Sequence, residues 1–135
     1  MPPIERLVET GIYADDLDQA ERFYREALGL EMLTKEPGRH VFFRVDESVL
    51  LIFRAEATLK GGMLPPHGAR GPGHFALGIP TESLDAWREH LRLHGVELEK
   101  EVEWPGGGKS MYFRDPAGNS VELMTRGLWG LSAGW

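Results

Sequence analysis

The chain of 135 residues contains no cysteine. This excludes disulfide bonds, thiolate nucleophiles and metal sites with cysteine ligands, and it fits a reducing compartment, so we expect a cytoplasmic protein. Long apolar runs are missing too. The longest, Val49–Phe53, has five residues, whereas a membrane helix needs about 20. The start of the chain has no apolar core of the signal-peptide type. We therefore expect no contact with a membrane.

An excess of positive charge is also missing. Fifteen Lys and Arg face 21 Asp and Glu, which gives a formal net charge of −6. An acidic protein has no field that attracts a phosphate backbone, so nucleic acid is not an expected partner. The chain does have 41% hydrophobic and 27% charged residues. This is the balance of a soluble globular protein, and the length suits one domain.

Two halves of the chain have the same order of predicted elements. In the first half, a helix begins after the N-cap candidate Asp16 and stops at Gly29; in the second half, a helix stops at Gly95. Apolar periodicity and turn residues predict strands at 7–14, 30–35, 40–45 and 49–53, and again at 74–79, 96–104, 110–114 and 120–125. Each half is therefore predicted to be a βαβββ module. One domain over 1–135 would comprise modules 5–54 and 74–125, a linker 55–73 and a tail 126–135.

The spacing of similar segments supports a repeat. Residues 29–31 (Gly-Leu-Glu) lie 66 positions before residues 95–97 (Gly-Val-Glu), and residues 46–51 lie 72 positions before residues 118–123. The second offset aligns Leu50 with Glu122. With one helix for four strands, each sheet is covered on one face, and its other face must meet the partner module or hold a ligand. The predicted fold class is α+β.

Strand alternation places three polar residues on the faces turned away from the helices. Successive side chains of a strand point to opposite faces. The apolar stripes therefore leave Glu9, His74 and Glu122 together with small neighbours on the non-helix faces. One imidazole and two carboxylates on such a surface would suit a divalent metal.

Specific motifs resemble the vicinal oxygen chelate superfamily, the group of glyoxalases, bleomycin resistance proteins and extradiol dioxygenases. They are residues 73–76 (Gly-His-Phe-Ala) and residues 113–123, which have the form F-x-D-P-x-G-N-x-x-E-L. The resemblance covers about 7–125. It implies paired βαβββ modules whose sheets curl into an eight-stranded cup around a metal. It also implies a homodimer, in which each cup would use modules of one chain or of both.

The same resemblance implies a set of metal ligands. His74 and Glu122 match family ligands, and Glu9 stands where the family usually has histidine. Leu50, aligned with Glu122, leaves no fourth ligand. One histidine and two carboxylates favour Mn²⁺, Fe²⁺ or Mg²⁺, with Ni²⁺ or Zn²⁺ as alternatives. Glu9 is also the candidate general base, and Tyr112 the candidate hydrogen-bond partner of a substrate.

These observations leave two main functions open, beside a catalytically inactive structural member of the family. The first is a metal-dependent lyase, isomerase, transferase or dioxygenase that acts on a small oxygenated metabolite or xenobiotic through bidentate chelation. The alternative is a metal-free protein that binds a small molecule, as in the bleomycin-resistance branch, with Trp104, Trp129 and Trp135 offering aromatic surfaces. The tail from 127 to 135, with two tryptophans, is predicted to pack on the domain or on a second subunit.

Overall fold

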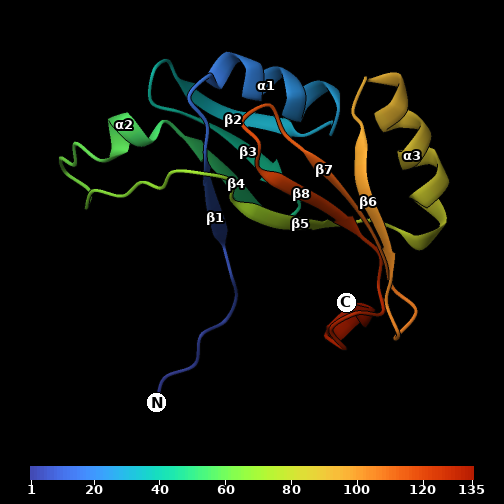
Figure 1. Cartoon of the computed structure of the whole chain (residues 1–135). Coiled ribbons are helices and arrows are strands. Elements are labelled where there is room, and N and C mark those ends of the chain that lie inside the picture. Colours follow the sequence, from blue (N-terminus) through green and yellow to red (C-terminus); the bar gives the residue numbers. More distant parts are fainter. The chain divides into compact units, whose positions relative to one another are not determined.

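The computed structural model describes residues 1–135, which form two compact units, Met1–Arg70 and Gly71–Trp135. Each unit consists of a four-stranded sheet and its helices (Figure 1). None of the helices has the length and the apolar character needed to cross a bilayer.

The first unit follows the predicted βαβββ order. Its elements are β1 (Glu9–Tyr13), α1 (Leu17–Glu26), β2 (Glu31–Glu36), β3 (His40–Val45), β4 (Ser48–Phe53) and α2 (Ala55–Thr58). The sheet order is β1-β4-β3-β2, and only the β1–β4 pair is parallel. Asp16 caps α1 by accepting a hydrogen bond of 2.9 Å from the Gln19 N–H, as predicted. Leu17, Ala20 and Tyr24 then face the sheet at helical spacing and are buried.

The second unit repeats this arrangement. Its elements are β5 (His74–Gly78), a 3₁₀ turn η1 (Thr81–Ser83), α3 (Leu84–Leu93), β6 (Leu98–Glu103), β7 (Lys109–Arg114), β8 (Ser120–Met124) and a 3₁₀ turn η2 (Ser132–Gly134). The sheet order is β5-β8-β7-β6, again with only the first pair parallel. Its core includes Leu91 of α3 with Met111, Phe113, Val121 and Leu123 of the sheet.

Details of the backbone confirm the repeat and the α+β class. The β2–β3 register shifts between Met32 and Thr34, and the β6–β7 register shifts between Leu98 and Lys100, at the same 66-residue offset. The glycines 29 and 95 that follow the two main helices both have a positive φ, of 66° and 69°. Glycine adopts this conformation without a Cβ penalty. Gly95 directly follows the C-cap of α3, His94, whereas α1 ends at Glu26, three residues before the predicted stop at Gly29. The short helix α2 was not predicted, because four residues are too few for a periodic pattern.

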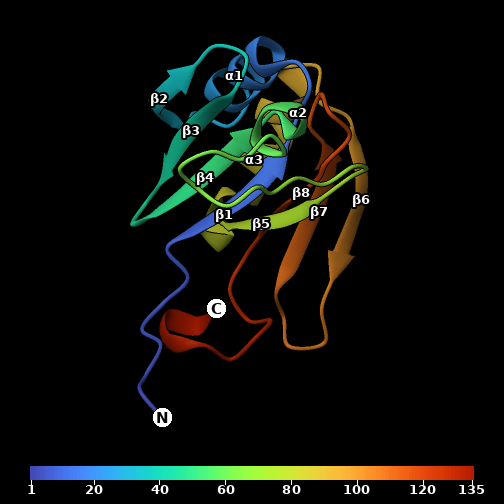
Figure 2. The ribbon, with the colours of Figure 1, turned by 90° about the vertical axis from the view of Figure 1, so that its left-hand side faces the viewer.

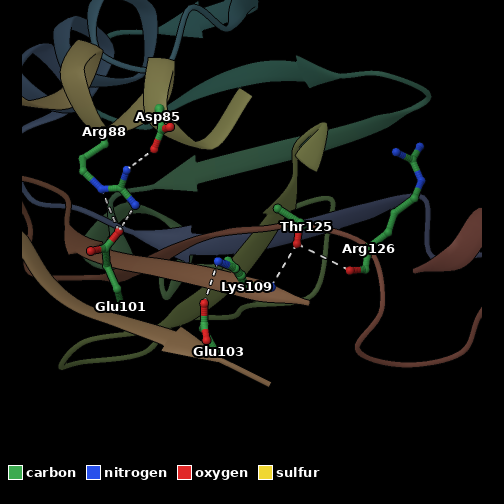
Figure 3. A network of polar contacts seen from close by, with 7 residues as sticks. All are labelled: Asp85, Arg88, Glu101, Glu103, Lys109, Thr125 and Arg126. Atoms are coloured by element: carbon green, nitrogen blue, oxygen red, sulfur yellow. Dashed lines mark hydrogen bonds and ion pairs between the residues drawn. The ribbon is translucent and has the colours of Figure 1, made fainter. Parts of the chain in front are cut away.

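Surface ion pairs connect α3 to the edge of the second sheet (Figure 3). Arg88 of α3 donates to Glu101 of β6 at 2.7 Å and also pairs with Asp85. On the neighbouring hairpin, Lys109 lies 2.6 Å from Glu103. Exposed pairs of this kind contribute little stability individually.

The register corrects one alignment made from the sequence. Glu122 lies opposite Ala76 in the β5–β8 pair, and Leu51 holds the same place opposite Gly11 in the β1–β4 pair. Leu51, and not Leu50, is therefore the counterpart of Glu122. Leu50 is 1% exposed in the core of the first unit. The offset of 72 was wrong by one because turns of different length precede the two strands, and a shift of one residue changes the face of a strand. Since Leu51 is also apolar, no carboxylate occupies the position.

Candidate functional site

One face of the second sheet carries the polar residues that alternation predicted. On β5, Phe75 is buried, whereas His74, Ala76 and Gly78 are exposed on the opposite side. β8 is the neighbour of β5 in the sheet (Figures 1 and 2) and places Glu122 beside Ala76. Two of the three predicted metal ligands, His74 and Glu122, therefore share one face of one unit.

His74 and Glu122 converge on a common point. His74 Nδ1 donates to the Ser120 carbonyl oxygen at 3.1 Å, which leaves Nε2 to face Glu122 Oε2 at 3.4 Å. The His74 side chain is 53% exposed and that of Glu122 is 7% exposed. A neutral imidazole nitrogen and a carboxylate oxygen both carry lone pairs, so the two atoms present electron-pair donors to one place. The separation also suits two ligands of one metal ion, whose bonds are about 2.0–2.2 Å long.

The other carboxylate oxygen of Glu122, Oε1, accepts a hydrogen bond from within the second unit. Ser110 of β7, which is buried, donates its hydroxyl hydrogen to Glu122 Oε1. The Ser110 oxygen in turn accepts a hydrogen bond of 2.8 Å from the indole N–H of Trp104. This chain fixes the carboxylate with Oε2 toward His74, an arrangement typical of groups that orient metal ligands. Strand alternation places Ser110 on the same face as Tyr112, but its bond to Glu122 joins two strands, and no pattern in the sequence indicates it.

Tyr112 also belongs to this face. It lies directly opposite Glu122 in the β7–β8 register, and its ring stacks at 6.3 Å from the ring of His74. Burial raises the pKa of the Tyr112 hydroxyl, and the Glu122 carboxylate raises this pKa further. The phenol therefore stays protonated near neutral pH and can donate a hydrogen bond beside the carboxylate.

The loop of the D-P-x-G-N motif positions His74. Asp115 accepts hydrogen bonds from the backbone N–H and the side-chain amide of Asn119, at 2.8 and 2.9 Å. The amide oxygen of Asn119 then accepts a bond of 2.8 Å from the N–H of Gly73. The β7–β8 turn is thereby tied to the residue before His74. The sequence identifies this motif as a family signature. In the structure, its hydrogen bonds hold the backbone next to His74.

The third predicted ligand, Glu9, lies in the first unit at the start of β1 and is exposed. Within either unit, no group of three histidine, aspartate or glutamate side chains comes together as a complete metal site. The second unit thus supplies a pair of ligands that fits a divalent metal, and the role of Glu9 stays a prediction.

Comparisons with known proteins agree with this geometry. Residues 6–123 match the model of the Glyoxalase/Bleomycin resistance protein/Dioxygenase superfamily. A crystal structure of lactoylglutathione lyase from Agrobacterium tumefaciens is 41% identical and covers 96% of this chain and 100% of its own, with a TM-score of 0.91. A glyoxalase/bleomycin resistance protein/dioxygenase from Nocardioides covers 100% of this chain and 91% of its own with a TM-score of 0.75, but at 21% identity this is a likeness of fold alone.

Curated relatives include longer proteins. Lactoylglutathione lyase of Arabidopsis thaliana is 31% identical over 121 residues, which is 83% of this chain and 41% of that protein. The chain therefore spans about two fifths of that relative. Residues 6–123, which match the family model, include His74, Glu122 and the D-P-x-G-N turn. The predicted fold is confirmed as glyoxalase-like. By sequence and by fold, this chain belongs to the glyoxalase/bleomycin resistance protein/dioxygenase superfamily.

Proposed function

We propose that this chain is a metal-dependent enzyme that acts on a small oxygenated molecule bound through two adjacent oxygens. The observation that carries the proposal is the convergence of His74 Nε2 and Glu122 Oε2 at 3.4 Å. The other ring nitrogen of His74, Nδ1, is bonded to the Ser120 carbonyl oxygen. The other oxygen of Glu122, Oε1, accepts a hydrogen bond from Ser110. Both groups therefore direct their remaining lone pairs to one place.

The residues divide the work as follows. His74 and Glu122 would hold the metal, and Glu9 would be its third ligand or the general base that removes a proton from the substrate. Tyr112, protonated and beside Glu122, donates a hydrogen bond to a substrate oxygen. A bound divalent ion supplies Lewis-acid stabilisation of negative charge on the substrate oxygens. A set of one histidine and two carboxylates favours Mn²⁺, Fe²⁺ or Mg²⁺.

The first compound to assay is lactoylglutathione, because a solved relative at 41% identity is described as a lactoylglutathione lyase. Leu51, opposite Gly11, gives the first unit no carboxylate at the place that Glu122 holds in the second. Because leucine cannot bind a metal, this position supplies no fourth protein ligand. The assay therefore extends to other substrates with two adjacent oxygens.

A metal-free binding protein is the second candidate. It is favoured by the finding that neither unit by itself assembles three metal-ligating side chains. In that case the same polar face would bind a ligand without turnover. A homodimer and a cytoplasmic location are further predictions for either function, and the cysteine-free composition supports the location.

Metal content tests the proposal. The protein is purified without chelators or an affinity tag and analysed by elemental mass spectrometry beside Glu122→Gln and a matched control, Glu97→Gln, which changes an exposed carboxylate of the same unit. We expect about one divalent ion per chain in the wild type and in the control, and a loss in Glu122→Gln. No metal in any of the three, even after incubation with Mn²⁺, Fe²⁺, Ni²⁺ and Zn²⁺, would favour the metal-free binding protein.

A further inference from the structure

The last residue of the chain, Trp135, packs against Gly78 at the end of β5. A Cβ at Gly78 would overlap the outer ring carbons of the Trp135 indole, at 2.6 Å from Cζ3 and 2.8 Å from Cζ2. No real side chain fits at such distances, so the lack of a side chain at Gly78 is what lets the indole sit on the strand. Glycine inside a strand often marks a site of close approach, and Gly78 has this role for the Trp135 indole.

Several contacts hold the tail in this place. The Arg126 guanidinium lies over the Trp135 ring at 4.5 Å from its centroid, and Arg126 Nε donates to the Ala133 carbonyl oxygen at 2.6 Å. The N–H of Gly127 donates to the Gly134 carbonyl oxygen at 2.7 Å, so the segment turns back on itself (Figure 2). Trp129 of the same tail is 69% exposed and has no comparable support. The tail therefore holds one of its two tryptophans against the sheet.

The indole lies on the face that carries the proposed metal ligands. Gly78 alternates with His74 and Ala76 along β5 and lies opposite Met124, while Ala76 lies opposite Glu122. Two residues of a strand rise about 7 Å. The face thus has a polar part at His74 and Glu122, and an apolar part at Gly78 and Met124 with Trp135 on it. Along the strands this apolar part lies about 7 Å from Glu122 and about 13 Å from His74.

We infer that Trp135 is a specificity-determining residue whose indole forms an apolar wall for the substrate, and that the substrate class is a bidentate oxygen ligand with an aryl or alkyl substituent. This inference rests on the proposed function. Arg126 covers one face of the indole, and Trp135 is still partly exposed, so ring surface is available to a ligand. The separation of about 7 Å matches the length of one aromatic ring attached to a chelating group. Stacking against tryptophan favours an aryl group.

Hydroxamates test this inference, because each presents two adjacent oxygens to a metal. The probes are acetohydroxamate, which has a methyl group, and benzohydroxamate, which has an aryl group. Their affinities for the full chain loaded with Mn²⁺ are measured by calorimetry. The variants are Trp135→Ala and Gly78→Ala, whose new Cβ displaces the indole. Trp129→Ala is the matched control, since it removes an exposed tryptophan of the same tail.

We expect benzohydroxamate to bind the wild type and Trp129→Ala at least about tenfold more tightly than acetohydroxamate. This ratio should fall to about threefold or less in Trp135→Ala and in Gly78→Ala, while the affinity for acetohydroxamate stays within about twofold. Equal affinities for the two probes in the wild type, or a preference that survives both variants, would overturn the inference alone. Failure of the wild type to bind Mn²⁺ or either hydroxamate would overturn the proposed function, and the inference with it.

Discussion

The indole N–H of Trp104, the residue that follows β6, donates a hydrogen bond of 2.8 Å to the hydroxyl of Ser110 in β7. Ser110 in turn donates a hydrogen bond to the buried carboxylate of Glu122. The two hydrogen bonds together therefore fix the orientation of this carboxylate. Trp104 therefore supports the site through its polar edge, in addition to any aromatic surface it offers.

Ser110→Ala should weaken metal binding about tenfold, because Glu122 loses the donor that holds Oε1. Ser110→Thr keeps the hydroxyl and should bind within about threefold of the wild type. Titration with Mn²⁺ gives both affinities. Ser120→Ala is the control, since only the backbone carbonyl of Ser120 contacts His74. Unchanged affinity in Ser110→Ala would show that the hydrogen bond does not orient the ligand.

Asn119→Ala should lower the free energy of unfolding by about 1–3 kcal/mol. The buried amide bonds both Asp115 and the N–H of Gly73, and the variant removes both of these hydrogen bonds. Urea denaturation measures the change, with Pro116→Ala as an exposed control in the same turn. Since the bond to Gly73 holds the residue before His74, metal affinity should fall as well. A stable Asn119→Ala protein with full metal affinity would contradict the positioning role.

Leu50→Glu and Leu51→Glu should differ sharply, although the residues are neighbours. Leu50 is 1% exposed in the core, so a carboxylate there would be buried without a partner and should cost about 3–5 kcal/mol. Leu51 is half-buried on the opposite face, and its variant should cost about 2 kcal/mol or less. Thermal denaturation compares them. Equal losses of stability would contradict the register that pairs Leu51 with Gly11.

His40 should make the stability of the protein depend on pH. Its side chain is 15% exposed, Nδ1 has no hydrogen-bond partner, and burial lowers its pKa below 6.5. Below 6.5 the unfolded chain therefore binds a proton that the folded chain does not, so stability falls as the pH falls from 6.5 to the lower pKa of the folded state. Above 6.5 this residue contributes no pH dependence.

His40→Phe keeps the stacking on Phe42, whose ring lies 4.1 Å away, and removes the titrating group. The free energy of unfolding should then fall less between pH 7 and pH 5 than in the wild type. His94→Gln is the control, because that histidine is exposed. An unchanged pH profile for His40→Phe would indicate that other groups cause the acid sensitivity.

The βαβββ repeat could be predicted from the sequence because its signals are local. Asp16 before a helix, Gly29 and Gly95 after helices and the alternation of β5 and β8 each act over a few residues. The same alternation placed His74 and Glu122 on one face, and the family motif at residues 113–123 agreed. The identity of the family followed from these motifs.

Other features depended on contacts between residues far apart in the chain. The register that makes Leu51 the counterpart of Glu122 is set by strand pairing, and an error of one residue in counting across turns reverses the face. The bond from Gly73 to Asn119 joins residues 46 positions apart. The contact of Trp135 with Gly78 spans a longer stretch. Periodicity carries no information on such pairs, because which side chains meet is decided only when the strands align and the core packs.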